Sequence, residues 1–141
     1  MLPLLATLSP NAAILILTLG LMLIALELNR PGSILPGAIG LLLSLLAAAS
    51  LATRHPQTKA VLWIVASLVL LMLATRGKRE SLVLAAVITT GLIFSICSLL
   101  PAVPGQSVSA WAAVLSGLIL GAGTIVLTGI ARRARQNKGL D

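Results

Sequence analysis

Five long runs of apolar residues, separated by short polar breaks, dominate the hydrophobic pattern of this chain. A helix needs about 20 predominantly apolar residues to cross the hydrocarbon core of a bilayer. The runs are rich in Leu and Ala, which favours helices over the shorter, alternating strands of a membrane barrel. The pattern therefore predicts an all-α fold, a polytopic membrane helix bundle with five transmembrane segments at residues 11–28, 34–53, 59–75, 81–100 and 110–131.

The residues that flank this helical domain of residues 11–131 are interpreted separately. Residues 1–10 are apolar but contain two prolines and no Lys or Arg, so we expect an uncleaved segment at the membrane interface and not a signal peptide. Residues 132–141 are basic and are expected to form a cytoplasmic tail. Whether the first segment spans the bilayer or enters and returns stays open on sequence grounds.

The amino-acid composition indicates whether the chain folds in water or in lipid. Hydrophobic residues make up 58% of the chain and charged residues 9%, whereas a soluble domain carries about 25% charged residues. The chain lacks the polar residues needed to cover a core in water, so the lipid bilayer must surround it.

The distribution of positive charge predicts the orientation. With five segments and an external amino terminus, eight of the ten Lys and Arg residues lie on the cytoplasmic side, leaving Arg54 and Lys59 outside. Trp63 and Trp111 then anchor the outer leaflet together. We expect a multi-pass protein of a bacterial cytoplasmic (inner) membrane, with the carboxyl terminus inside. Apart from Arg30, the residues expected to fix topology and contact lipid are Arg76, Lys78, Arg79, Arg132, Arg133, Arg135 and Lys138.

Catalysis and nucleic-acid binding find little support. His55 is the only histidine and lies in a loop, and Cys97 is the only cysteine, so neither a Cys-based metal site nor a disulfide within the chain is expected. The net charge of +7 comes without a stacking platform of aromatic residues, so it indicates anionic lipid and not nucleic acid. We predict a protein that is not an enzyme, with no cofactor.

The most informative stretch is Glu27–Gly40, between the first two segments. Glu27 is the only acidic residue inside an apolar run, which makes it a candidate for function. It lies at a helix end, where the dipole disfavours a carboxylate, so Arg30 or the free N–H groups at the start of the next helix must compensate. The residues predicted to build this turn are Glu27, Arg30, Pro31, Gly32, Pro36, Gly37 and Gly40.

Two interpretations of Glu27 stay open. In the first, its carboxylate clamps the turn between the first two segments. In the second, it couples the movement of protons or ions in a small transporter. Its position near a helix end favours the first interpretation, since a coupling site belongs near the middle of the membrane.

Small residues at spacing four form two rows. Gly40, Ser44 and Ala48 make one, and the last segment carries the other, for which we predict helix packing at Ala113, Gly117 and Gly121. Such rows let helices approach closely. They fit packing within the chain or association of the chain into a homo-oligomer, and the sequence does not separate the two.

The stretch around Glu27, Pro31, Gly32, Gly37 and Gly40 resembles the first membrane hairpin of the NfeD family, in which an apolar helix ends in Glu before a Pro-Gly turn. The resemblance implies an integral membrane protein that acts with stomatin-like scaffold proteins in bacterial membranes. The ClpP-class protease domain and the OB-type barrel of longer members have no counterpart here, which implies a short form and weakens the implied stomatin link. The expected function is a non-enzymatic scaffold or accessory subunit, with the small transporter as the alternative.

Overall fold

The structure is a computed structural model, which describes Pro3 and residues 7–29, 32, 34–76, 82–101 and 107–139. Throughout this part of the chain the architecture is all-helical, as predicted, and no strand occurs in it. The helices are α2 (Pro10–Asn29), α3 (Ile34–Ala52), α4 (Thr58–Arg76), α5 (Leu82–Cys97) and α6 (Ala110–Asn137).

Local chemistry explains where the helices begin and end. Ser9 caps α2, because its hydroxyl accepts a hydrogen bond from the N–H of Ala12 at 3.2 Å, and Pro10 occupies the first helical position, where no N–H is needed. At the end of α3, His55 adopts a positive φ of 53°, and Pro56 prevents the helix from continuing.

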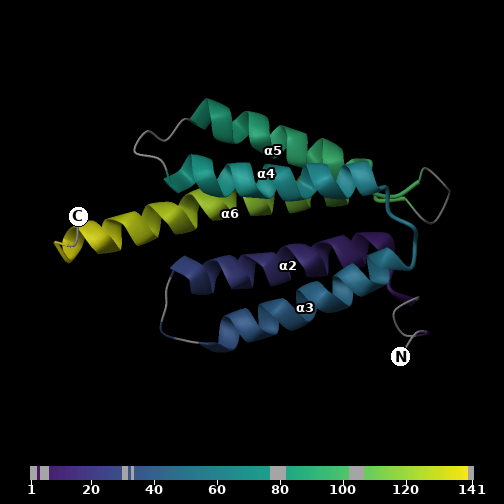
Figure 1. Ribbon diagram of the computed structural model, residues 1–141, viewed down its shortest axis with the longest axis horizontal. Helices are drawn as coiled ribbons and strands as arrows, with labels where there is room; N and C mark the ends of the chain where they lie inside the picture. The colour runs from purple at the N-terminus through teal and green to yellow at the C-terminus, as the bar shows by residue number, and fades with distance from the viewer. Residues whose placement is uncertain are drawn as a thin grey trace.

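The helices run alternately up and down along the long axis (Figure 1). α6 lies in the middle and packs against α2, α5 and α4. α2 and α3 form the most extensive helix pair, and α3 packs against no other helix of the described chain. α3 is thus an outer helix, and α2 is its one neighbouring helix in the described chain.

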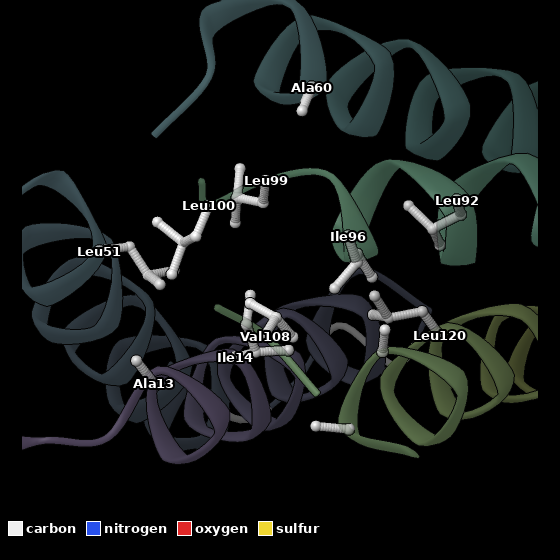
Figure 2. Packing of buried hydrophobic residues seen from close by; sticks show 12 residues of the cluster. Ala13, Ile14, Leu51, Ala60, Leu92, Ile96, Leu99, Leu100, Val108 and Leu120 are labelled. Atoms are coloured by element: carbon white, nitrogen blue, oxygen red, sulfur yellow. The ribbon is translucent and has the colours of Figure 1, made fainter. Parts of the chain in front are cut away.

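The bundle has two unlike ends. We call the end where α2, α4 and α6 begin the core end, because the main hydrophobic cluster lies there (Figure 2). We call the opposite end, which α6 reaches with Arg132 and Arg133, the basic end. All five helices contribute to the main cluster, whose buried members are Ala13, Ile14, Leu51, Ala60, Leu92, Ile96, Leu99, Leu100, Val108, Ala112, Ala113 and Leu120.

Polar bonds close the core end. The Asn11 side-chain amide donates to the Ser109 hydroxyl at 2.8 Å, and the Ser109 N–H donates to the side-chain oxygen (Oδ1) of Asn11 at 2.8 Å. The Arg54 guanidinium donates to the carbonyl of Leu8, and the N–H of Gln57 donates to the carbonyl of Leu99 at 2.8 Å. These bonds join the start of α2 to α6, and the loop after α3 to the end of α5.

Large apolar side chains cover the outside. Examples on α3 are Leu42 and Leu45, each 60% exposed. Three helices, α2, α3 and the stretch Ala110–Ala134 of α6, are long and apolar enough to cross a membrane, and α4 and α5 contribute shorter apolar stretches. Because such a surface would be unfavourable in water, the bundle is a membrane fold with its apolar surface toward lipid.

The last helix is longer than its apolar run. α6 continues through Asn137, so the expected basic tail of residues 132–141 begins inside a helix. Arg, Ala and Gln are good helix formers, and neither Pro nor Gly interrupts the sequence between Ile130 and Asn137. At 28 residues and 1.5 Å per residue, α6 is about 42 Å long, more than the hydrocarbon core of a bilayer.

Candidate functional site

The Glu27 carboxylate lies against the first turn of α3. A Cβ placed on Gly37 would overlap an oxygen of this carboxylate, so the absence of a side chain at Gly37 makes room for it. The first N–H groups of a helix lack partners within the helix and carry a partial positive charge, which favours an anion there. Among the residues that the structure describes, Glu27 makes no hydrogen bond or ion pair, so its contact with α3 is one of proximity.

Gly32 and Pro36 are two further residues of the predicted turn. Gly32 has a φ of 154°, which L side chains rarely adopt, so its place in the turn requires glycine. Pro36 is the third residue of α3, where its missing N–H is tolerated. Arg30 and Pro31 lie outside the described residues, and the proposed compensation of Glu27 by Arg30 remains a prediction.

A close backbone contact in the α2–α3 pair joins Gly20 to Gly40. A Cβ on Gly20 would lie 2.7 Å from the carbonyl oxygen of Gly40, and a Cβ on Gly40 would lie 2.6 Å from the carbonyl oxygen of Gly20. Ser44, one turn along α3, also lies against Gly20. The two backbones therefore touch, and only glycine fits on either side.

Sequence reasoning identified Gly40 but missed Gly20. A signal for it was present, because Gly20 lies in the helix before the turn and Gly40 in the helix after it, and an antiparallel hairpin packs these two helices together. The predicted row on α3 also departs from the structure at its end. Ala48 is exposed and Ala47 is buried instead, because the straight helix turns away from a strict spacing of four.

The small residues of α6 lie on the face that packs against α5. Ala113 is fully buried, Gly117 lies against the side chain of Ile93, and Gly121 lies against Thr89. In this structure α5 of the same chain occupies the row. Their importance for packing, and the homo-oligomer alternative, stay predictions.

A cavity of about 150 Å³ lies on the other face of α2, between α2, α4 and α6. Glu27 is not among the residues around it. The lining is mainly apolar, with an amide and two hydroxyls, and consists of Leu21, Met22, Ile24, Ala25, Leu28, Asn29, Leu68, Met72, Leu120, Thr124 and Thr128.

Most of the described basic residues lie at the basic end, whereas Arg54 and Lys59 lie with the aromatic residues toward the core end. Arg132 is half-buried, while Arg133 and Lys138 are exposed, all at the basic end. Arg76 ends α4 and Arg135 lies in the last turn of α6 at the same end, whereas Lys78 and Arg79 fall outside the described residues. Trp63 is the sixth residue of α4 and Trp111 the second residue of α6; they are 65% and 58% exposed and lie toward the core end.

The third aromatic residue of the chain was missed. Phe94 is 75% exposed and lies three residues before the end of α5, again at the core end. All three aromatic side chains therefore lie exposed near one end. The two Trp residues are typical of an aromatic belt at one membrane interface, and Phe94, which has no polar group, lies exposed toward the same end.

Groups that could perform catalysis stay apart. His55 is exposed in the loop after α3, and Cys97 is a free, half-buried thiol at the end of α5. Within the described ranges, no three residues among His, Cys, Asp and Glu come close enough to hold a metal ion.

An antiparallel bundle of apolar helices, with lipid-facing side chains and charges at its ends, defines a multi-pass integral membrane protein. The family model of the NfeD integral membrane domain matches residues 11–131. The chain belongs to the NfeD family, in agreement with the resemblance seen around Glu27. No curated protein and no solved structure matches it.

Proposed function

We propose that this protein is a non-enzymatic scaffold or accessory subunit that binds another membrane protein through the outer face of α3. The observation that carries the proposal is the position of α3, which packs against α2 and against no other helix of the described chain. A helix placed in this way presents most of its circumference to lipid or to a partner helix.

The outer face of α3 has the spacing that a partner helix requires. Most positions of α3 are exposed, and five of them follow one another at intervals of four and three residues, which is the repeat of a helix–helix seam. Three of the five are alanines, which allow close approach of a second backbone in a membrane. We call these residues the α3 seam: Ala38, Leu42, Leu45, Ala49 and Ala52.

Glu27 supports the same proposal as a structural element. Its carboxylate lies against the first turn of α3, where it holds the hairpin in place. A coupling residue of a transporter would instead be expected at a water-accessible site, and Glu27 does not line the cavity between α2, α4 and α6. The geometry therefore favours the clamp over transport.

The proposed location is the bacterial cytoplasmic membrane, with the amino terminus outside and the carboxyl terminus inside. The exposed aromatic residues at the core end and the Arg residues at the basic end support this orientation. A stomatin-like membrane protein is the first candidate partner, because the resemblance to the NfeD family implies it.

Site-specific crosslinking tests the proposal. A photoreactive amino acid at Leu45 is expected to crosslink to a stomatin-like protein co-expressed in the same membrane. The Ala49→Trp variant should remove the crosslink and the stoichiometric co-purification. Ala66→Trp is the matched control, because Ala66 is exposed on α4, and it should retain both. Equal loss in both variants, or no crosslink from Leu45, contradicts the proposal.

A liposome experiment distinguishes the transport alternative. The purified protein should not carry protons across vesicles loaded with a pH-sensitive dye, and Glu27→Gln should change nothing in this assay. Proton flux that Glu27→Gln abolishes, with the fold intact, would replace the scaffold proposal with a transporter.

A further inference from the structure

We propose that the cavity between α2, α4 and α6 is a binding site for an anionic phospholipid from the leaflet at the basic end. One acyl chain enters the cavity and the phosphate binds at Arg132. This proposal concerns a different face of α2 from the Glu27 clamp and does not depend on the scaffold function.

The cavity changes character along its length. On α6 the ridge runs from Leu120 through Thr124 and Thr128 to Arg132, each one turn after the last. On α4 the lining residues Leu68 and Met72 are followed after one more turn by the last residue of that helix, an arginine. α6 thus leads from the apolar cavity to a cation at the basic end, and α4 ends at the same end of the bundle.

The polar groups inside the cavity do not favour a polar ligand at depth. The Thr124 hydroxyl donates to the carbonyl of Leu120 at 2.6 Å, and the Thr128 hydroxyl donates to the carbonyl of Thr124 at 2.7 Å. The Asn29 amide donates to the carbonyl of Ala25 at 2.8 Å. With both threonine protons used inside α6, neither hydroxyl has a proton left to donate to a ligand in the cavity.

Size and lining fit a segment of hydrocarbon. A volume of about 150 Å³ is similar to that of apolar cavities that stay dry and take up a small apolar molecule. It suits a short stretch of one acyl chain and not a whole lipid. The rest of the lipid would lie along the outside of the bundle.

The positive charge of Arg132 indicates which phospholipid headgroup the site prefers. Arg132 is half-buried and continues the ridge of Thr124 and Thr128 by one turn, whereas its neighbour Arg133 is exposed. Arg132 also interacts with another group of the protein, but a guanidinium has five N–H donors and can bind a phosphate in addition. Positive charge at this depth favours an anionic over a zwitterionic lipid.

Native mass spectrometry of the protein released from nanodiscs tests the site. The probes are phosphatidylglycerol and phosphatidylcholine with identical acyl chains. We expect one phosphatidylglycerol to be retained preferentially, and Arg132→Gln to lower its retention about fivefold, the effect of one cation at a membrane surface. Arg133→Gln removes the same charge from an exposed position and should leave retention unchanged.

A second pair of variants tests the acyl-chain part. Ala25→Leu fills the cavity and should reduce retention, while Ala122→Leu adds the same side chain at an exposed position of α6 and should not. Size-exclusion chromatography confirms that each variant remains folded. Equal retention of the two lipids, equal effects of the two Arg variants, or no effect of filling the cavity would each overturn the proposal.

Discussion

The two faces of α2 are packed in opposite ways. Toward α3, glycine meets backbone at Gly20 and Gly40, and the helices touch along the hairpin. Toward α4 and α6, flexible side chains such as Met22 leave a cavity of about 150 Å³. The comparison teaches that in a bilayer small residues fix the position of a helix, whereas large apolar residues fill space without specifying it, because lipid is as apolar as they are.

The largest effect on stability is expected on the face of α2 that packs against α3. Gly40→Ala places a Cβ 2.6 Å from the carbonyl oxygen of Gly20, so one backbone must shift. We expect the free energy of unfolding to fall by about 2 kcal/mol, within the range for overpacking. Unfolding in mixed micelles measures it. The control is Gly129→Ala, where no atom lies near the added Cβ and a gain of about 0.5 kcal/mol is expected from helix propensity.

The next effect concerns the two hydrogen bonds between Asn11 and Ser109, which hold the start of α2 against the start of α6. Asn11→Ala removes both hydrogen bonds to Ser109 and leaves two of its polar groups without these partners. A loss of about 1.5 kcal/mol is expected, measured in the same unfolding assay. Asn137→Ala, at an exposed position near the end of α6, should change stability by less than about 0.5 kcal/mol. Similar losses of stability in Asn11→Ala and Asn137→Ala would mean that the hydrogen bonds to Ser109 contribute nothing to stability.

A smaller effect is expected at the turn. Gly37→Ala displaces the Glu27 carboxylate, but this group ends a flexible side chain and can move away. The expected loss is about 1 kcal/mol, the upper range for a surface charge at a helix end. In the Glu27→Ala background the same substitution should have no cost, so a double-mutant cycle must show coupling. Additive effects of the two substitutions on stability would show that the Glu27 side chain does not interact with the start of α3.

The smallest effect on stability is expected on the face of α2 that lines the cavity. A Cβ on Gly123 would meet only the sulfur and the terminal methyl of Met22, which can move into the cavity. Gly123→Ala should therefore leave stability unchanged within about 0.5 kcal/mol. A loss as large as that of Gly40→Ala, in a thermal unfolding experiment on both variants, would show that the two faces are equally tight.

Much of the architecture could be predicted from local patterns. The apolar runs, the Pro-Gly breaks and the residues of the Glu27 turn are visible as sequence, and the matched family agrees with them. The pairing of helices could not be predicted in the same way. Gly117 and Gly121 form a row that fits any partner helix, and only the fold shows Ile93 and Thr89 of α5 against them.

The sequence by itself determined the solvent, the helical class and the separation of the tryptophans from most of the basic residues, because each follows from the cost of placing a group in lipid or in water. Tertiary structure decided which neighbour each helix has. It placed α3 on the outside, brought Gly20 against Gly40, and opened a cavity beside Thr124. These outcomes depend on how side chains from distant segments fit together, and similar apolar helices differ in that fit far more than in their composition.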